Sequence, residues 1–227
     1  MEQLLSNPVF NALSTSDSHL GFGTSKAKTF YEEVSPFAGY EEGYEHGFDE
    51  LYSILPQQQK HILFANPVAI EPPKQWQIII HVEGVQMHHI KESRYEVNHT
   101  PVPLNTTHVP AMLELTELMK PGPFGKRTIE FGHYYGIFDQ GRLVAMAGQR
   151  MHIGDYSEIS AVCTHPDYLG KGYAASLVQQ QLNLIYAEGR KPFLHVKADN
   201  TRAVELYERL GFTIVRPMQF YFLKKKG

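Results

Sequence analysis

One stretch of the chain combines residue types that can hold an anion. From Glu158 to Ala174 an apolar strand runs into a turn containing Gly170, Lys171 and Gly172, and a helix comes directly after it. Glycine reaches positive φ and lets backbone N–H groups approach a ligand, while the first turn of the helix adds unpaired donors and partial positive charge. The pattern predicts a phosphate or diphosphate site, although a turn that uses glycine for geometry alone has the same pattern.

A second stretch, residues 200–212, predicts a helix with a tyrosine on its buried face. Asn200 or Thr201 can cap the first turn, and a glycine comes after the last one. The apolar residues repeat at helical spacing and include Tyr207, whose hydroxyl then needs a polar partner. Residues 192–198 predict a buried strand between the two stretches, so the order of elements is that of a βαβ crossover and then another helix.

These two stretches resemble the motifs of the GNAT superfamily of N-acetyltransferases, which transfer an acyl group from acyl-coenzyme A to an amine. The superfamily signature Q/R-x-x-G-x-G/A falls on residues 169–174, where Gly172 and Ala174 match and Leu169 departs. The second motif matches at Asn200, Tyr207, Leu210, Gly211 and Phe212. The residues around the motifs, 146–148 and 160–166, are most similar to the branch that resembles the C-terminal domain of glycine N-acyltransferases. The likeness covers roughly the last 130 residues, which is one domain's worth.

The resemblance implies a fold and a co-substrate. The fold class is α/β, with a mixed, mostly antiparallel GNAT-like sheet flanked by helices and a smaller N-terminal α/β lobe. Acetyl-CoA is the implied co-substrate, and no metal is implied. Its diphosphate is expected on the backbone of the glycine turn, formed by Leu169, Gly170, Lys171, Gly172, Tyr173 and Ala174. Lys171 is expected to add positive charge there.

The pantetheine arm of the coenzyme is expected to lie along the strand before the glycine turn, where the resemblance implies that this strand splays from its neighbour. Main-chain groups of Val162, Cys163 and Thr164 would pair with the arm. One of their N–H groups would serve as the oxyanion donor. Asn200 is expected to cap its helix and to contact the coenzyme as well.

Two residues are expected to move protons. Tyr207 matches the family's general acid, which protonates the sulfur of the coenzyme, although a core tyrosine on an apolar stripe gives the same pattern. Glu158 is the best carboxylate for a general base, because partial burial would raise its pKa toward neutrality. A solvent-facing glutamate at the strand edge, and proton removal through water, both stay open.

The acceptor pocket is expected between residues 121–124 and residues 216–219, by the same resemblance. Phe124 and Tyr134 are the expected substrate contacts, and their aromatic character permits an apolar or aromatic acceptor. Core packing explains the same aromatic residues without an acceptor.

Composition limits the remaining classes. The chain has 227 residues, a net charge of −3 and one cysteine, Cys163. A single cysteine excludes an internal disulfide, and Cys163 is expected to be a small buried hydrophobe in preference to a nucleophile that accepts the acyl group. It has no basic start with a long apolar run after it, so we expect a cytoplasmic protein that neither spans nor binds a membrane. The basic residues near residue 225 are too few to indicate nucleic acid. Among the 12 histidines no metal-ligand spacing occurs, so no metal site is expected.

The sequence predicts two parts, residues 1–84 as an N-terminal α/β lobe of unknown role and residues 85–227 as the transferase domain. Gly84 is the predicted joint, although the lobe could share a core with the transferase domain. The predicted helices span residues 40–55, 109–120, 173 onward and 200–210. The predicted strands span residues 61–64, 76–82, 85–90, 134–138, 142–152, 158 onward and 192–198, and residues 213–216 and 219–224 are expected to be paired last strands.

The function indicated is transfer of an acetyl group from acetyl-CoA to a primary amine by direct attack, with a small molecule or amino acid as the favoured acceptor. The alternatives are a protein N-terminus or lysine as acceptor, a non-catalytic acyl-CoA-binding regulatory module, and an ATP-binding enzyme that uses the same turn. The oligomeric state stays open, with a homodimer among the alternatives.

Overall fold

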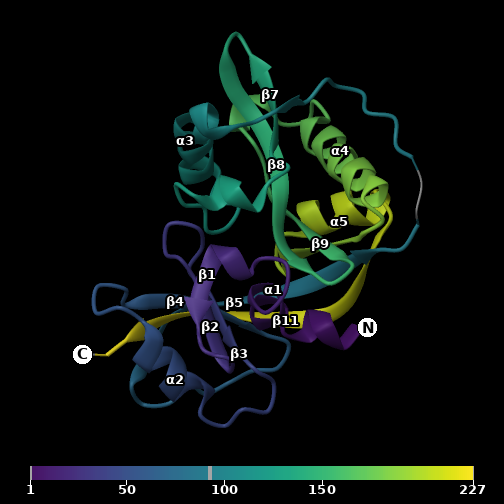
Figure 1. Ribbon diagram of the computed structural model, residues 1–227. Helices are drawn as coiled ribbons and strands as arrows, with labels where there is room; N and C mark the ends of the chain where they lie inside the picture. Colours follow the sequence, from purple (N-terminus) through teal and green to yellow (C-terminus); the bar gives the residue numbers. More distant parts are fainter. Residues whose placement is uncertain (1, 92–93, 227) are drawn as a thin grey trace.

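The computed structural model describes residues 2–91 and 94–226. Within them one sheet of 11 strands has the order β1-β2-β3-β4-β11-β5-β10-β9-β8-β7-β6 (Figure 1). The strands are β1 (Gly21–Gly23), β2 (Ala27–Phe30), β3 (Phe37–Tyr40), β4 (His61–Asn66), β5 (Trp76–His89), β6 (Val102–Pro103), β7 (Tyr135–Asp139), β8 (Arg142–Ile153), β9 (Tyr156–Thr164), β10 (Lys191–Lys197) and β11 (Phe212–Lys225).

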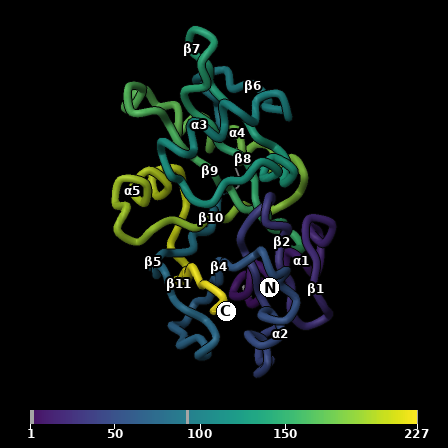
Figure 2. Tube along the Cα trace, turned by 90° about the vertical axis from the view of Figure 1, so that its left-hand side faces the viewer, coloured from purple at the N-terminus to yellow at the C-terminus, as the bar shows by residue number. Residues whose placement is uncertain are grey.

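Helices cover both faces of this sheet. They are α1 (Pro8–Leu13), α2 (Gly47–Ile54), α3 (Val109–Met119), α4 (Tyr173–Ala187) and α5 (Thr201–Arg209), with short 3-10 turns at Glu2–Ser6, Ser18–Leu20, Thr106–His108, Thr128–Phe131 and Pro166–Tyr168. Apolar residues of α4 and α5 share a cluster on one face of β9 and β10, and apolar residues of α1 and α3 share a cluster on the other face (Figures 1 and 2).

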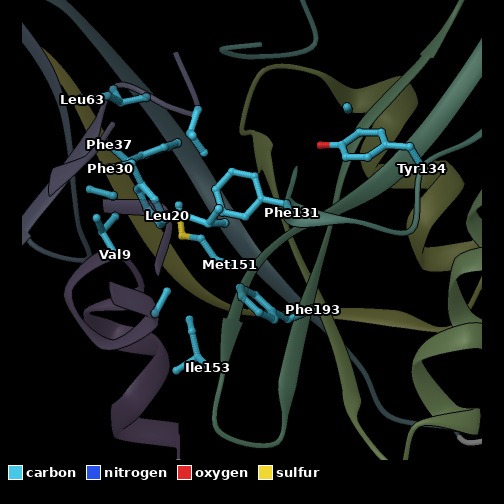
Figure 3. Packing of buried hydrophobic residues seen from close by; sticks show 14 of the residues in the cluster. Val9, Leu20, Phe30, Phe37, Leu63, Phe131, Tyr134, Met151, Ile153 and Phe193 are labelled. Atoms are coloured by element: carbon cyan, nitrogen blue, oxygen red, sulfur yellow. The ribbon is translucent and has the colours of Figure 1, made fainter. Parts of the chain in front are cut away.

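The predicted parts 1–84 and 85–227 share one sheet and one core. The predicted joint, Gly84, lies in the middle of β5, which pairs with β11 along its length and with β10 over its second half. A single apolar cluster joins Val9, Phe30 and Phe37 from the first part to Phe131 and Met151 from the second (Figure 3). The structure therefore corresponds to the alternative in which the lobe and the transferase domain have a common core.

Five predicted elements differ from the observed ones, in three places along the chain. The helix predicted from residue 40 begins at Gly47, because β3 extends to Tyr40 and a turn with Gly43 at φ +80° comes next. The two strands predicted at 76–82 and 85–90 are one strand, β5, since Gly84 does not break it. The last two strands do not pair with each other: they form the continuous β11, which has a β-bulge between Ile214 and Arg216.

The elements that carry the two sequence motifs agree with prediction. The helix predicted at 109–120 is α3, the predicted hairpin is β7 and β8 in antiparallel register, and strand, glycine turn, helix, strand and helix occur in order as β9, α4, β10 and α5. The single parallel pair in this region, between β9 and β10, is the one that the βαβ crossover requires.

Candidate functional site

The glycine turn before α4 presents unused donors. Gly170 and Gly172 have φ of +81° and +80°, values that favour glycine, and Gly172 directly precedes the first turn of α4. Among the described residues, the amides of residues 170–175 donate no hydrogen bond, and the first amide of this region with a protein acceptor is that of Ser176. The turn and the helix start therefore form a row of N–H groups free to bind an anion.

Residues 94–101, which we call the brace, contact this turn. Residues 94–101 lie along α4, where Tyr95 and Asn183 exchange two main-chain-to-side-chain hydrogen bonds of 2.9 Å (Figure 1). The His99 Nε2 lies 3.0 Å from the carbonyl oxygen of Lys171, so this nitrogen carries the proton and donates. The His99 ring also meets the Tyr173 ring edge-on at 4.7 Å. The brace occupies a carbonyl of the turn and leaves its amides free.

Strands β9 and β10 separate where the coenzyme arm is expected. Their parallel pairing covers only Tyr156–Glu158 on β9 and Lys191–Phe193 on β10. Beyond these residues β9 keeps its partner β8, and β10 keeps its partner β5, so the edges that face each other have no strand between them in the described chain. Ala161, with φ of +53°, forms a bulge within β9 in the separated part. Val162, Cys163 and Thr164 lie on this open edge.

Tyr207 lies on the buried face of α5. Its side chain is 8% exposed and meets the Phe212 ring at 5.8 Å. Burial raises the pKa of Tyr207 well above its ordinary value, with a smaller contribution from the Cys163 thiol. The phenol is therefore protonated at neutral pH, and its hydroxyl has no hydrogen-bond partner among the described residues. Asn200 begins this helix, and its side chain accepts a bond from the Ala203 amide at 3.2 Å.

The expectation that burial raises the pKa of Glu158 is wrong. Glu158 is fully buried, and Arg150 binds both of its carboxylate oxygens, with Nε at 2.9 Å and an η-nitrogen at 2.7 Å. The Nδ1 of His195 lies 2.8 Å from the same carboxylate. Burial alone would raise the pKa, but Arg150 and then His195 outweigh it and hold the pKa of Glu158 at about 2. A carboxylate so stabilised is a poor general base.

Neighbouring groups also fix the protonation of His195. The amide nitrogen of Gln86 donates to the Leu5 carbonyl at 2.8 Å, which sets the orientation of the amide group. The same nitrogen lies 3.0 Å from His195 Nε2, which must then accept. His195 is therefore neutral, with its proton on Nδ1 and donated to Glu158.

The two expected acceptor contacts lie together. Phe124 and Tyr134 meet edge-on with ring centroids 5.7 Å apart. Tyr134 is 2% exposed, its burial raises its pKa far above the ordinary value, and its hydroxyl is fully buried without a hydrogen-bond partner in the described structure. In Figure 3 this hydroxyl points toward the side of the cluster occupied by Phe131. Contact of either residue with an acceptor stays a prediction.

A pocket of about 420 Å³ lies apart from these residues. It opens between α3 and the turn that joins β7 to β8, and it is lined by Ala111, Glu114, Leu115, Leu118, Gln140, Gly141, Arg142, Leu143 and His165. None of the predicted site residues borders it.

Sequence reasoning missed Arg150 and His195. Each is a polar residue in a mostly buried strand, Arg150 in β8 and His195 in β10, and a polar side chain among apolar neighbours was the signal that could have found them. Cys163 was predicted correctly as a buried residue: burial raises the pKa of its thiol to about 12, so the thiolate nucleophile is disfavoured.

Two other kinds of site are absent from the described ranges. In residues 2–91 and 94–226 no three His, Cys, Asp or Glu side chains lie close enough together to hold a metal ion. No helix in the described part of the chain has the length and apolar character needed to cross a membrane.

With this geometry in place, comparison with known proteins identifies the class. The model of the FR47-like protein family matches residues 134–221, which include β7 to β10, both motifs and most of β11. A solved structure of a putative acetyltransferase from the GNAT family of Novosphingobium aromaticivorans is 34% identical, has a TM-score of 0.90 and covers 99% of each chain. The chain therefore belongs to the GNAT family of acetyltransferases, and the predicted fold class is confirmed.

Matches to curated relatives are shorter. A mycothiol acetyltransferase of Corynebacterium glutamicum (strain R) is 36% identical over 86 residues, which are 37% of this chain and 30% of that protein. The N-alpha-acetyltransferase RimI of Mycobacterium tuberculosis is 32% identical over 94 residues, which are 40% of this chain and 58% of that protein. The chain thus matches about a third of the length of the mycothiol acetyltransferase.

Proposed function

We propose that this protein transfers the acetyl group of acetyl-CoA to a primary amine by direct attack. The observation that carries the proposal is the row of free amides at residues 170–175, which continues the open edge of β9. A diphosphate at the amides would direct the pantetheine arm along that edge, because the arm can make main-chain hydrogen bonds as an added strand would. The Thr164 hydroxyl, buried without a partner in the described structure, adds an unused polar group at the same edge.

The reaction needs a neutral amine, a stabilised oxyanion and a proton for the leaving sulfur. The amine nitrogen attacks the thioester carbonyl carbon, an amide of the open β9 edge binds the oxyanion, and the carbon–sulfur bond then breaks. Tyr207 donates its phenolic proton to the sulfur, for which its protonated state suits it. We assign no base role to Glu158. The proton of the amine passes to water, and water returns a proton to the Tyr207 phenolate.

A small molecule or an amino acid is the favoured acceptor. The similarity to a mycothiol acetyltransferase supports a small molecule, and the similarity to RimI supports a protein N-terminus as the second candidate. Phe124 and Tyr134 would line the acceptor side. The finer likeness to the glycine N-acyltransferase branch, a cytoplasmic location and a homodimer are further parts of the proposal.

Ligand binding tests the co-substrate. Acetyl-CoA at a hundredfold its Kd should stabilise the protein by about 2.7 kcal/mol, and ATP at the same concentration should not. Stabilisation by ATP alone would favour the nucleotide-binding alternative. An amine panel, including peptides with free N-termini, would then be screened for thiol release from acetyl-CoA. Binding of acetyl-CoA without turnover across the panel would favour the non-catalytic module.

A further inference from the structure

A buried ion pair, Arg150 with Glu158, lies where β9 and β10 part. Phe193 and Glu158 form the last parallel pair between the two strands. We call the place where this pairing ends the vertex. The Glu158 side chain lies there, is fully buried and is not used by the proposed reaction.

Its hydrogen bonds cross the neighbouring strands. Arg150 reaches Glu158 from β8, and His195 reaches it from β10. Gln86 continues the network from β5, where it is the register partner of His195. We call these four residues, Arg150, Glu158, His195 and Gln86, the vertex clamp. It links four successive strands of the sheet through side chains at the level where main-chain pairing between β9 and β10 ends.

Hydrogen bonds hold the side chains of the vertex clamp in one arrangement. The carboxylate accepts two bonds from Arg150 and one from His195, and the neutral His195 has both ring nitrogens engaged. Breaking one contact would leave a buried charge or polar group unpaired, which is costly in a low-dielectric interior. The strands on either side of the vertex are therefore held in fixed relative positions.

The N-terminal lobe covers the clamp. The Leu5 carbonyl accepts from Gln86 at 2.8 Å, and the central guanidinium carbon of Arg150 lies over the Phe37 ring, 4.7 Å from its centroid. These contacts exclude water from the ion pair and connect residues 1–84 to the vertex.

We propose that the vertex clamp is a positioning device for acetyl-CoA: it fixes the separation of β9 and β10 and so the place of the amides on the open β9 edge. Its residues act through the backbone of Val162–Thr164 and not by contact with the reacting atoms. The inference rests on the proposed function, since it concerns the coenzyme arm of the same site. A displacement of the edge by about 1 Å is enough to weaken an aligned set of hydrogen bonds strongly.

The test uses two variants of the full chain. His195→Phe removes the link from β10 but leaves the Arg150–Glu158 pair intact, and because His195 is neutral the substitution changes no charge. Glu158→Gln removes the carboxylate while keeping its shape. We expect each variant to bind acetyl-CoA about ten-fold more weakly or worse, measured by titration calorimetry, with the pH dependence of kcat unchanged in shape. Circular dichroism and a cooperative melt establish that each variant is folded, and His195→Phe suffices if Glu158→Gln does not fold.

A matched control comes from a surface pair. Arg127 binds Glu130 with the same two-bond geometry, at 2.7 and 2.8 Å, but both side chains are more than a third exposed. Glu130→Gln should leave the Kd for acetyl-CoA unchanged.

Two results would overturn the clamp. In one, the folded variants keep the acetyl-CoA affinity of the unaltered protein. In the other, kcat falls at unchanged affinity and recovers as the pH rises, which would make the network a proton acceptor. Failure of the unaltered protein to bind acetyl-CoA is a different outcome and contradicts the proposed function itself.

Discussion

The Tyr207 side chain is buried, and its phenol is protonated without a hydrogen-bond partner in the described structure, so removing the hydroxyl should cost turnover and not stability. Tyr207→Phe should lower kcat by about 10²- to 10⁴-fold, the usual worth of a positioned acid, and leave the Kd for acetyl-CoA unchanged. Steady-state thiol release and calorimetric binding measure the two quantities. Turnover equal to that of the unaltered protein would identify Tyr207 as a core residue only.

The Glu158 carboxylate makes the free energy of unfolding depend on pH in the acid range. Its folded pKa of about 2 lies below the ordinary value of 4.5, so its ionised form is stabilised in the folded state. This contribution, about 3 kcal/mol, is complete above pH 4.5 and is lost as the pH falls toward 2. Urea denaturation between about pH 7 and pH 3 should therefore show a steeper loss of stability for the unaltered protein than for Glu158→Gln. Parallel curves would contradict the assigned pKa direction.

Gly148 permits the position of the Tyr134 ring. A Cβ at residue 148 would lie 2.3 Å from a ring carbon of Tyr134, too close for the ring to stay in place. Gly148→Ala should therefore lower the free energy of unfolding by about 1–3 kcal/mol. Combining it with Tyr134→Leu, which removes the ring, should cost less than the sum of the two single changes. Additive losses in denaturant titrations would show that the two sites do not interact.

Among single residues, the sequence predicts best those that act through local backbone geometry. Gly170, Gly172 and Asn200 have the conformations and the cap that their positions in the motifs indicate. It does not predict Arg150 or His195 beside Glu158, because strand register, and not sequence distance, brings them together. The direction of the Glu158 pKa was wrong for the same reason.

Among the elements, the segment at residues 94–101 has the most direct effect on the coenzyme site. His99 holds the Lys171 carbonyl from outside the turn, so His99→Ala should loosen the turn and weaken acetyl-CoA binding several-fold, without changing kcat at saturation. The exposed His46, at the start of α2, supplies the control, and His46→Ala should bind as the unaltered protein does. Titration calorimetry measures the Kd for acetyl-CoA of the unaltered protein and of both variants. Equal Kd values for all three would contradict the role of the brace.

Helices with local signals are the elements that the sequence predicts best. For α3 and α5 the periodicity and the flanking Pro or Gly residues lie within or beside the segment itself, and Asn200 caps α5. β5 and β11 were each predicted as two shorter strands, because Gly84 is typical of a break and because the resemblance implied two paired last strands. Pairing of the two long strands with each other keeps both continuous, and that information is not local.

For the whole molecule, the division at residue 84 can be tested directly. A fragment of residues 85–227 lacks β4 and the first half of β5, which are the two neighbours of β11 from Gln219 to Lys224. We expect this fragment not to unfold cooperatively and not to bind acetyl-CoA, while the full chain does both. A cooperative melt with coenzyme-dependent stabilisation of the fragment would instead support the predicted two-domain division.

The place of β11 between β4 and β5 also bears on how the protein is made. A ribosome completes β4 and β5 long before it reaches residues 212–225, so the nascent chain carries two strands whose shared neighbour does not yet exist. Their unpaired edges stay open to other chains during that interval. We therefore expect the newly made polypeptide, more than the finished enzyme, to depend on chaperones.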